Sequence, residues 1–333
     1  MIGICAYGRP DDRYLRYLAQ YGVQDVVLSE DSLPDSAERF APSRLESSDA
    51  HWDFHGITVA QQHYADAGMR VVAIENPHPN WCFDQIILGL QGRDRQIENL
   101  AATIRNMGRV GIRALGYNWM VNEPTLRRNS WRTALNTPNR GNNVVSSFDM
   151  ELAAAGPAFR DRTYTADELW ANYAYFINAI VPVAQDAGVR LALHPDDPPV
   201  ESLGGIPRLF GSPEGFARAM QLAASDASGL NLCLGNCTAM GTDVVAAATR
   251  HAAEGQIVYS HVQGVQGAVP SFRECFLDEA DCDFLAVLRA LTSAGFDGMM
   301  LPGHNPHAEY EDQHGSQGMA FAIGYLRGLL QAV

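Results

Sequence analysis

The sequence predicts an α/β protein built as a single (β/α)8 barrel, and three observations support this. Eight short runs rich in Val, Ile and Leu recur along the 333 residues, stretches with helical periodicity separate them, and no low-complexity linker interrupts the series. Near-continuous apolar runs are typical of parallel strands buried on both faces. Length alone would favour two domains, but one barrel domain over residues 1–333 accounts for the regular alternation.

The predicted strands and helices alternate along the whole chain. Strands are predicted at residues 2–6, 25–28, 70–75, 112–117, 190–194, 231–234, 257–262 and 298–301. Helices are predicted at residues 11–21, 58–68, 94–108, 166–188, 213–225, 242–253, 283–295 and 319–331. Capping residues support several boundaries, because Thr165 and Ser212 precede two of the helices and Gly188 and Gly295 end two of them.

Two connections are longer than the rest, residues 29–55 after the second strand and 119–164 after the fourth. Both follow the carboxyl end of a strand, so both lie on the face where barrels carry their active sites, either as lids or as dimer contacts. The second contains more arginines than acidic residues. The guanidinium groups of Arg132 and Arg140 suit a carboxylate or phosphate of a substrate, and pairing with acidic neighbours or a partner subunit explains them equally well.

The composition is that of an ordinary globular protein, with 47% hydrophobic and 19% charged residues. No apolar run approaches the roughly 20 residues of a membrane-spanning helix, and the first residues lack a basic segment before an apolar one. We therefore expect a cytoplasmic protein with no membrane partner. Subtracting 38 acidic from 24 basic residues leaves a net charge of −14, which argues against nucleic acid as a partner.

Lysine is absent, so all 24 basic residues are arginine. Schiff-base aldolases, pyridoxal phosphate enzymes and Walker-A nucleotide sites need a lysine amine, and these classes are excluded. The G-x-G-x-x-G pattern is absent as well, so nothing supports a nicotinamide or flavin site. The six cysteines are scattered and fit reduced thiols better than a disulfide framework.

Three residues with metal-binding side chains stand at the ends of consecutive predicted strands. His194, Cys233 and His261 end the fifth, sixth and seventh strands at matching depth. One such histidine alone is more often a hydrogen-bonded polar residue, and one such cysteine is more often a small buried apolar residue. A thiol and two imidazoles at successive strand ends instead predict one divalent metal with an open coordination position.

Other polar residues follow the same strand ends. Asp196 or Asp197 either orients His194 or caps the next turn, and His304 after the eighth strand is a general acid or base, or a fourth metal ligand. Glu75 at the end of the third strand acts in acid–base chemistry, binds a substrate hydroxyl, or pairs with an arginine inside the protein. Asn118 follows the fourth strand.

The chain resembles a known family, the barrel-type mannonate dehydratases of hexuronate breakdown. The most specific stretches that carry the resemblance are His-Pro-Asp-Asp-Pro-Pro at residues 194–199 and Leu-Gly-Gly-Ile-Pro-Arg at 203–208, with Tyr-Asn-Trp-Met at 117–120, Trp-Arg-Thr at 131–133 and Cys-Leu-Gly-Asn at 233–236. The resemblance implies a hydro-lyase that converts D-mannonate into 2-keto-3-deoxy-D-gluconate, and a homo-oligomer.

The resemblance also implies site residues. A divalent ion, Mn2+ in the family, is then held by His194, Cys233, His261 and an aspartate that precedes the catalytic histidine, which corresponds to His304. The three protein ligands suit Zn2+ or Fe2+ as well. The resemblance and the positions at strand ends and in the long loop together suggest candidates for substrate binding. They are Glu75, Asn118, Arg132, Arg140, Asp196 and Arg208.

Three departures from the family pattern concern the active centre. Gly303 stands where the family carries the aspartate ligand, Gln263 replaces an arginine, and the nearest equivalent of a family tyrosine is His314. His304, water, or a glutamate at 309 or 311 remain as candidates for the missing ligand. His314 becomes the candidate acid–base partner of His304.

Two other functions remain open. One is a sugar or sugar-acid isomerase or epimerase on a xylose-isomerase-like barrel, although such barrels usually coordinate metal with carboxylates. The other is a relative that binds a sugar acid without turning it over, because Gly303 has disabled its metal site. Metal content distinguishes them, since a non-catalytic relative should purify without stoichiometric metal.

Overall fold

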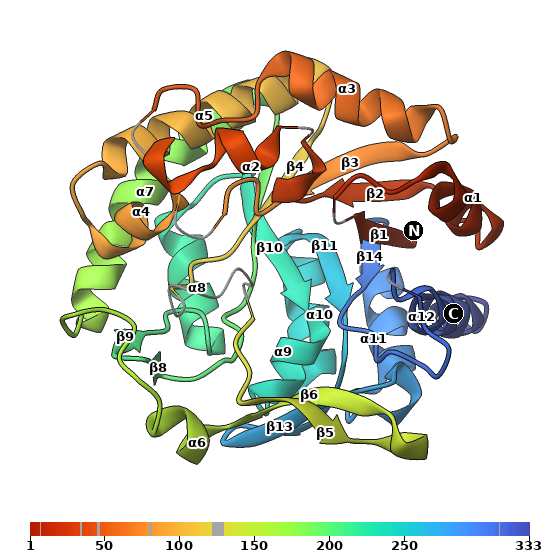
Figure 1. Ribbon diagram of the computed structural model, residues 1–333. Coiled ribbons are helices and arrows are strands. Elements are labelled where there is room, and N and C mark those ends of the chain that lie inside the picture. The colour runs from red at the N-terminus through yellow and green to blue at the C-terminus, as the bar shows by residue number, and fades with distance from the viewer. Residues whose placement is uncertain (7, 34, 45–46, 80–81, 122–129, 313) are drawn as a thin grey trace.

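Eight parallel strands form the predicted barrel (Figure 1). The computed structural model describes residues 1–6, 8–33, 35–44, 47–79, 82–121, 130–312 and 314–333. An isolated parallel bridge between Ile2 and Met300 brings the last strand back to the first. The strands are, in spatial order, β1 (Gly3–Ala6), β2 (Asp25–Leu28), β3 (Arg70–Glu75), β4 (Ala114–Tyr117), β7 (Arg190–Leu193), β10 (Ser228–Cys233), β11 (Ile257–Val262) and β14 (Met299–Pro302).

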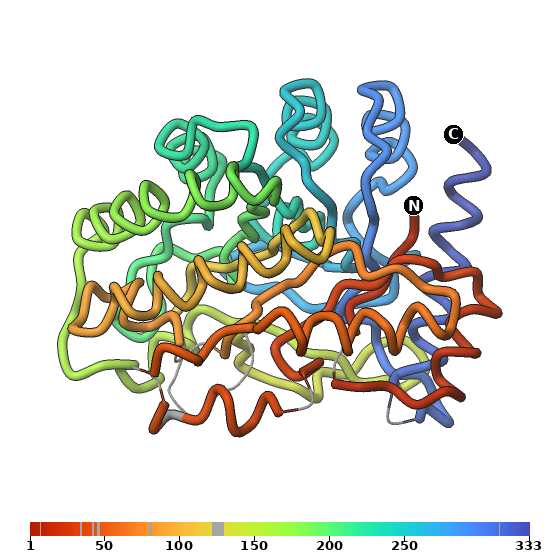
Figure 2. The backbone as a smooth tube through the Cα atoms, turned by 90° about the horizontal axis from the view of Figure 1, so that it is seen from above, coloured from red at the N-terminus to blue at the C-terminus, as the bar shows by residue number. Residues whose placement is uncertain are grey.

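Helices surround the barrel and confirm the predicted alternation (Figures 1 and 2). The Thr165 hydroxyl and the Glu168 carboxylate form a reciprocal capping box at the start of α7, and left-handed Gly188 ends that helix. Ser212 accepts a hydrogen bond from Gly215 at the start of α8. The surrounding helices are α1 (Asp12–Gln20), α3 (Phe54–Ala65), α5 (Arg93–Val110), α7 (Ala166–Ala187), α8 (Pro213–Leu222), α10 (Val244–Ala253), α11 (Phe284–Ser293) and α12 (Ser316–Leu330).

The barrel interior is filled by side chains, as barrels of this size require. One buried cluster contains side chains from five different strands: Val27, Ala73, Ala192, Tyr259 and Leu301. All six residues of β10 are buried. Since side chains fill the interior, the polar groups of the site lie at the carboxyl ends of the strands.

Within the described residues, no helix has the length and apolarity needed to cross a membrane.

An antiparallel sheet built from two distant loops lies beside the carboxyl ends of the barrel strands. The loop after β4 supplies β5 (Ala134–Pro138) and β6 (Val144–Asp149), and the loop after β11 supplies β12 (Gly264–Ala268) and β13 (Ser271–Cys275). They pair in the order β12-β13-β6-β5, and we call this unit the accessory sheet. The insertion after β4 was predicted, whereas the hairpin after β11 was not.

The remaining elements are short and lie mostly in the loops after the barrel strands. They are η1 (Glu30–Ser32), α2 (Ser36–Arg39), η2 (Pro42–Arg44), α4 (Asp84–Leu88), η4 (Arg140–Asn142), α6 (Met150–Ala154), β8 (Ser202–Leu203), β9 (Ile206–Pro207), α9 (Leu234–Ala239) and η5 (Leu277–Glu279). The first three lie within the predicted insertion after β2.

Candidate active site

The three predicted metal ligands come together at the carboxyl ends of neighbouring strands. His194 directly follows β7, Cys233 is the last residue of β10, and His261 pairs with Cys233 in the register of β10 and β11. Each residue offers one ligand atom, and these atoms all lie within 4.8 Å of one another. We call these three residues the ligand cluster.

The chemistry of the ligand cluster fits a divalent ion. Burial lowers the pKa of His194 to about 4, with a further contribution from His261, so the ring is a neutral donor. Its Nδ1 lies 2.7 Å from the Pro195 carbonyl, which leaves Nε2 for a ligand. Burial also raises the pKa of the Cys233 thiol well above its usual value. At this buried position, a nearby cation would favour the thiolate form of Cys233.

Glu75 is a buried carboxylate that contacts the ligand cluster. Its Oε2 accepts hydrogen bonds from the Tyr259 hydroxyl (2.7 Å) and from Asn231 (3.2 Å), and lies 2.9 Å from Nε2 of His261. Burial acts to raise the pKa of Glu75, but His261, His194 and the hydrogen bond from Tyr259 together lower it to about 2. The described partners of Glu75 include no arginine, in contrast to one of the predicted alternatives.

Close approach at Glu75 depends on a glycine. A β-carbon added at Gly116 on β4 would lie 1.9 Å from the Tyr259 hydroxyl and 2.8 Å from Cγ of Glu75. Neither contact is possible, so a side chain at this position would displace the hydrogen bond between Tyr259 and Glu75.

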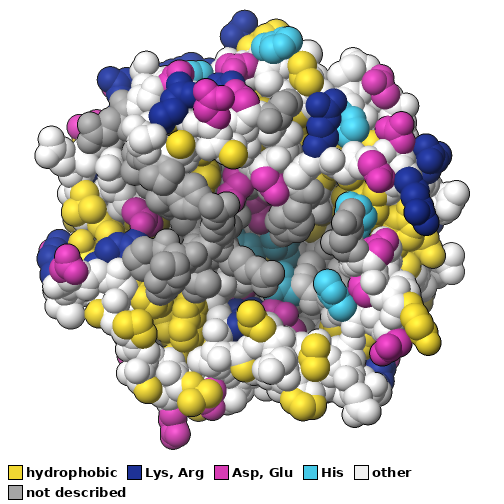
Figure 3. Space-filling view, in the orientation of Figure 1, with side chains coloured by type: hydrophobic (Ala, Val, Ile, Leu, Met, Phe, Trp, Pro, Cys, Tyr) yellow, Lys and Arg dark blue, Asp and Glu magenta, His cyan; other side chains and the backbone are white. Residues whose placement is uncertain are grey.

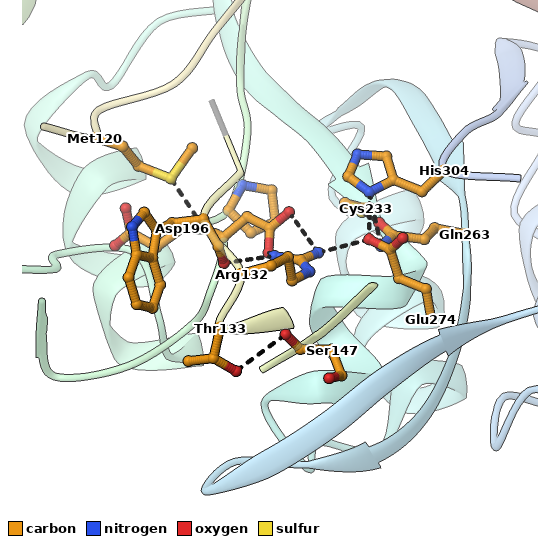
Figure 4. A network of polar contacts seen from close by, with 12 residues as sticks. Met120, Arg132, Thr133, Ser147, Asp196, Cys233, Gln263, Glu274 and His304 are labelled. Carbon is orange, nitrogen blue, oxygen red and sulfur yellow. Dashed lines mark hydrogen bonds and ion pairs between the residues drawn. The ribbon is translucent and has the colours of Figure 1, made fainter. Parts of the chain in front are cut away.

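A second group of charged residues surrounds His304 and includes a residue that the sequence did not reveal (Figure 4). His304 Nδ1 lies 2.6 Å from Oε1 of Glu274, which stands on β13. The same oxygen accepts a hydrogen bond of 2.8 Å from Arg132. Arg132 also donates two hydrogen bonds, of 2.5 and 3.1 Å, to the two oxygens of Asp197. We call these four residues the charged chain.

Gln263 joins the ligand cluster to the charged chain (Figure 4). Its Oε1 accepts a hydrogen bond from the Cys233 thiol at 3.6 Å, and its Nε2 donates to Glu274 at 3.2 Å. Nε2 also lies 3.3 Å from Nδ1 of His304. The residue that replaces the expected arginine therefore bridges the two halves of the site.

The charges of the chain stabilise each other. Burial would raise the pKa of Glu274, but His304 and Arg132 lower it to about 2. Burial would lower the pKa of His304, but Glu274 together with Asp197 outweighs burial and raises it. His304 therefore has one ring nitrogen fixed by a carboxylate and a greater affinity for a proton than an isolated imidazole.

Two of the predicted substrate-binding arginines are paired with protein carboxylates. The Arg132 side chain is only 3% exposed and binds Asp197 and Glu274. Arg140, on η4, forms a two-pronged ion pair with Asp278 at 2.6 and 3.1 Å, and its side chain is 44% exposed. These contacts agree with the alternative interpretation of both residues, pairing with acidic neighbours.

Asp196 and Arg208 form a buried pair away from the charged chain. One oxygen of Asp196 accepts a hydrogen bond of 2.6 Å from the Phe210 backbone, and the other lies 4.0 Å from Arg208. Burial raises the pKa of Asp196 to about 6. The backbone contact fits a role of Asp196 in the turn better than a role in orienting His194.

Asn118 is buried beside a small cavity that His78 and Tyr117 also line.

The remaining candidates lie in the segment after β14. The His314 ring is exposed and stacks on Tyr14 of α1 with 4.4 Å between ring centroids. Glu311 accepts hydrogen bonds from backbone amides at the start of α12, including Gly318 at 2.9 Å. Neither residue is part of the ligand cluster.

Figure 3 shows the surface of the molecule in the orientation of Figure 1. Histidine and acidic side chains gather in a depression at the centre of this view.

Comparison with known proteins points to one family. The family model for D-mannonate dehydratase (UxuA) matches residues 2–153 and 158–333. A mannonate dehydratase of Streptococcus suis strain 05ZYH33 is 29% identical over 314 residues, covering 84% of this chain and 83% of that protein. The crystal structure of mannonate dehydratase from Streptococcus suis serotype 2 superposes with a TM-score of 0.85 at 26% identity, covering 99% of this chain and 94% of that chain.

More distant solved structures share the fold alone. A xylose isomerase domain protein from Planctomyces limnophilus has a TM-score of 0.61 at 13% identity, and covers 100% of this chain and 98% of that chain. The similarity extends over the whole barrel and concerns the arrangement of its strands and helices.

Proposed function

The chain belongs to the D-mannonate dehydratase (UxuA) family and is therefore a hydro-lyase, and we propose that it dehydrates D-mannonate to 2-keto-3-deoxy-D-gluconate with one bound divalent ion. The observation that carries the proposal is the ligand cluster, whose ligand atoms lie within 4.8 Å of one another at three neighbouring strand ends. We further propose that the protein works in the cytoplasm as a homo-oligomer, as its resemblance to the family implies.

The ion would be held by the ligand cluster, His194, Cys233 and His261. The resemblance to the family favours Mn2+, and the nitrogen and sulfur donors also suit Zn2+ or Fe2+. When bound, the ion supplies positive charge that stabilises the enediolate-like charge developing beside the substrate carboxylate. Glu75 contacts His261 and keeps that ring in a fixed orientation.

His304 is the proposed base. Its Nδ1 is held by Glu274, so Nε2 is the nitrogen left to remove the proton from C2 of the sugar acid. The electron pair of the broken C2–H bond forms the C2–C3 double bond as the C3 hydroxyl leaves. A proton from His304 itself or from His314 accompanies that hydroxyl, and water is released. The enol then becomes the 2-keto product by losing the proton of its C2 hydroxyl and taking up a proton at C3.

The substrate would lie between the ligand cluster and His304, since Gln263 brings these two groups together. Glu75 contacts His261 of the ligand cluster, and Arg132 contacts Glu274, the partner of His304, so both are candidate substrate contacts. Asn118, Arg140, Asp196 and Arg208 remain proposals as substrate contacts.

The direct test is the reaction itself. Purified protein with added Mn2+ is expected to convert D-mannonate into 2-keto-3-deoxy-D-gluconate, followed by NMR. D-Gluconate, which differs in configuration at C2, serves as the matched control and should react far more slowly, because a fixed base reaches C2 from one side. Failure of the Mn2+-loaded protein to turn over D-mannonate would contradict the proposed substrate.

Restoring the missing aspartate should strengthen ion binding. A β-carbon added at Gly303 would have no other atom within 4 Å, so a side chain fits there. We expect Gly303→Asp to lower the Kd for Mn2+ by about tenfold, because a negatively charged ligand is added beside the ion. Calorimetry measures the change, and Gly303→Ala is the control that fills the space without a ligand. Equal affinities in the two variants would show that position 303 does not face the ion.

A further inference from the structure

We propose that Glu274 is a positioning residue that fixes His304 through Nδ1 and thereby commits Nε2 to proton transfer. The inference rests on the proposed function, in which His304 is the base. It adds a residue from the accessory sheet, a part of the chain outside the eight strand–helix repeats that carry the ligand cluster.

The first argument is the contact and its support. Glu274 Oε1 lies 2.6 Å from His304 Nδ1, and the Glu274 side chain is 11% exposed. Glu274 stands on β13, which pairs with β12 on one side and β6 on the other. Phe272 of β13 stacks on Phe148 of β6 at 5.5 Å. A paired strand, and not a free loop, therefore places the carboxylate.

The second argument is the conformation of His304. Its φ of 51° lies in the left-handed region, which residues other than glycine seldom adopt unless their surroundings hold them there. The contact with Glu274 is one such constraint, because it fixes the ring from the opposite side of the site. The backbone conformation of His304 and the carboxylate of Glu274 thus together determine the position of the His304 ring.

The third argument is charge. Three described charged groups surround the imidazole: Glu274 from β13, Arg132 from the segment before β5, and Asp197 from the loop after β7. Glu274 and Asp197 favour the protonated ring, and Arg132 opposes it. A carboxylate on Nδ1 fixes the tautomer and stabilises the imidazolium that forms when Nε2 takes the substrate proton. The Nδ1 proton stays shared with Glu274 throughout.

The experiment follows the titration of His304 by NMR in protein labelled at histidine and loaded with diamagnetic Zn2+. The His304→Gln variant assigns the signal. Glu274→Gln, which removes the charge and keeps the shape, is expected to lower the pKa of His304 by about one unit or more. Arg132→Gln should shift it the opposite way. Glu279→Gln, which removes a carboxylate that contacts Arg140, is the control and should leave it unchanged.

Kinetics provide the second readout. For Glu274→Gln we expect kcat to fall about 100-fold with little change in KM, and Glu274→Asp should recover part of the loss because it keeps the charge. An unchanged His304 titration in folded Glu274→Gln and in Arg132→Gln would overturn the inference. That outcome is distinct from failure of the proposed function, in which the wild-type protein would leave D-mannonate unreacted whatever the titration shows.

Discussion

Replacing His304 by alanine is expected to lower kcat for D-mannonate by about 1000-fold, the range that general acid–base groups contribute. The ring is held at Nδ1 by Glu274 and is the one described histidine of the charged chain. Because His304 lies outside the ligand cluster, metal content should remain at the wild-type level. Steady-state kinetics and metal analysis of the same preparation check both statements.

Two further histidine variants sharpen that result. His55→Ala removes an exposed histidine from α3 and should leave turnover unchanged. His314→Ala separates the two proposed routes for the second proton, since it slows turnover only if His314 protonates the leaving hydroxyl. Wild-type activity in His304→Ala would remove His304 from the mechanism.

Replacing Cys233 by alanine should abolish both ion binding and turnover. The thiol is buried between two imidazole ligands, and its loss leaves only His194 and His261. We expect the affinity for Mn2+ or Zn2+ to fall more than 100-fold, beyond the 10- to 100-fold effect of removing a residue that merely orients a ligand. Metal analysis after dialysis and calorimetry measure the loss.

Cys237→Ala is the matched control. Cys237 is also buried and lies four residues further along the same chain segment, but it belongs to the apolar cluster behind the site. This variant should bind metal as the wild type does. Stoichiometric metal in Cys233→Ala would show that the ion, if one binds, has other ligands.

The sequence was sufficient for the barrel and the ligand cluster because both depend on local patterns. Apolar runs and helix caps define the repeats, and the caps at Thr165 and Ser212 are where they were predicted. In a parallel barrel all strands end on the same face. His194, Cys233 and His261 therefore had to meet once their strands were recognised.

Glu274 was missed because its position depends on pairing between distant segments. β13 pairs with β6, and these strands come from the loops after β11 and β4. Short antiparallel strands in loops carry too weak a periodicity to be recognised singly. The partners of Arg132 were hidden for the same reason, since Asp197 and Glu274 stand 65 and 142 residues away.

The central claim is that the ligand cluster holds the ion on which dehydration depends. The most direct measurement strips the protein with a chelator, reloads it with one equivalent of Mn2+, and records metal content and formation of 2-keto-3-deoxy-D-gluconate from D-mannonate together. We expect no turnover in the stripped protein and recovery in proportion to bound ion, with neither binding nor recovery in Cys233→Ala. Full turnover by the stripped protein, or equal recovery by Cys233→Ala, would contradict the claim.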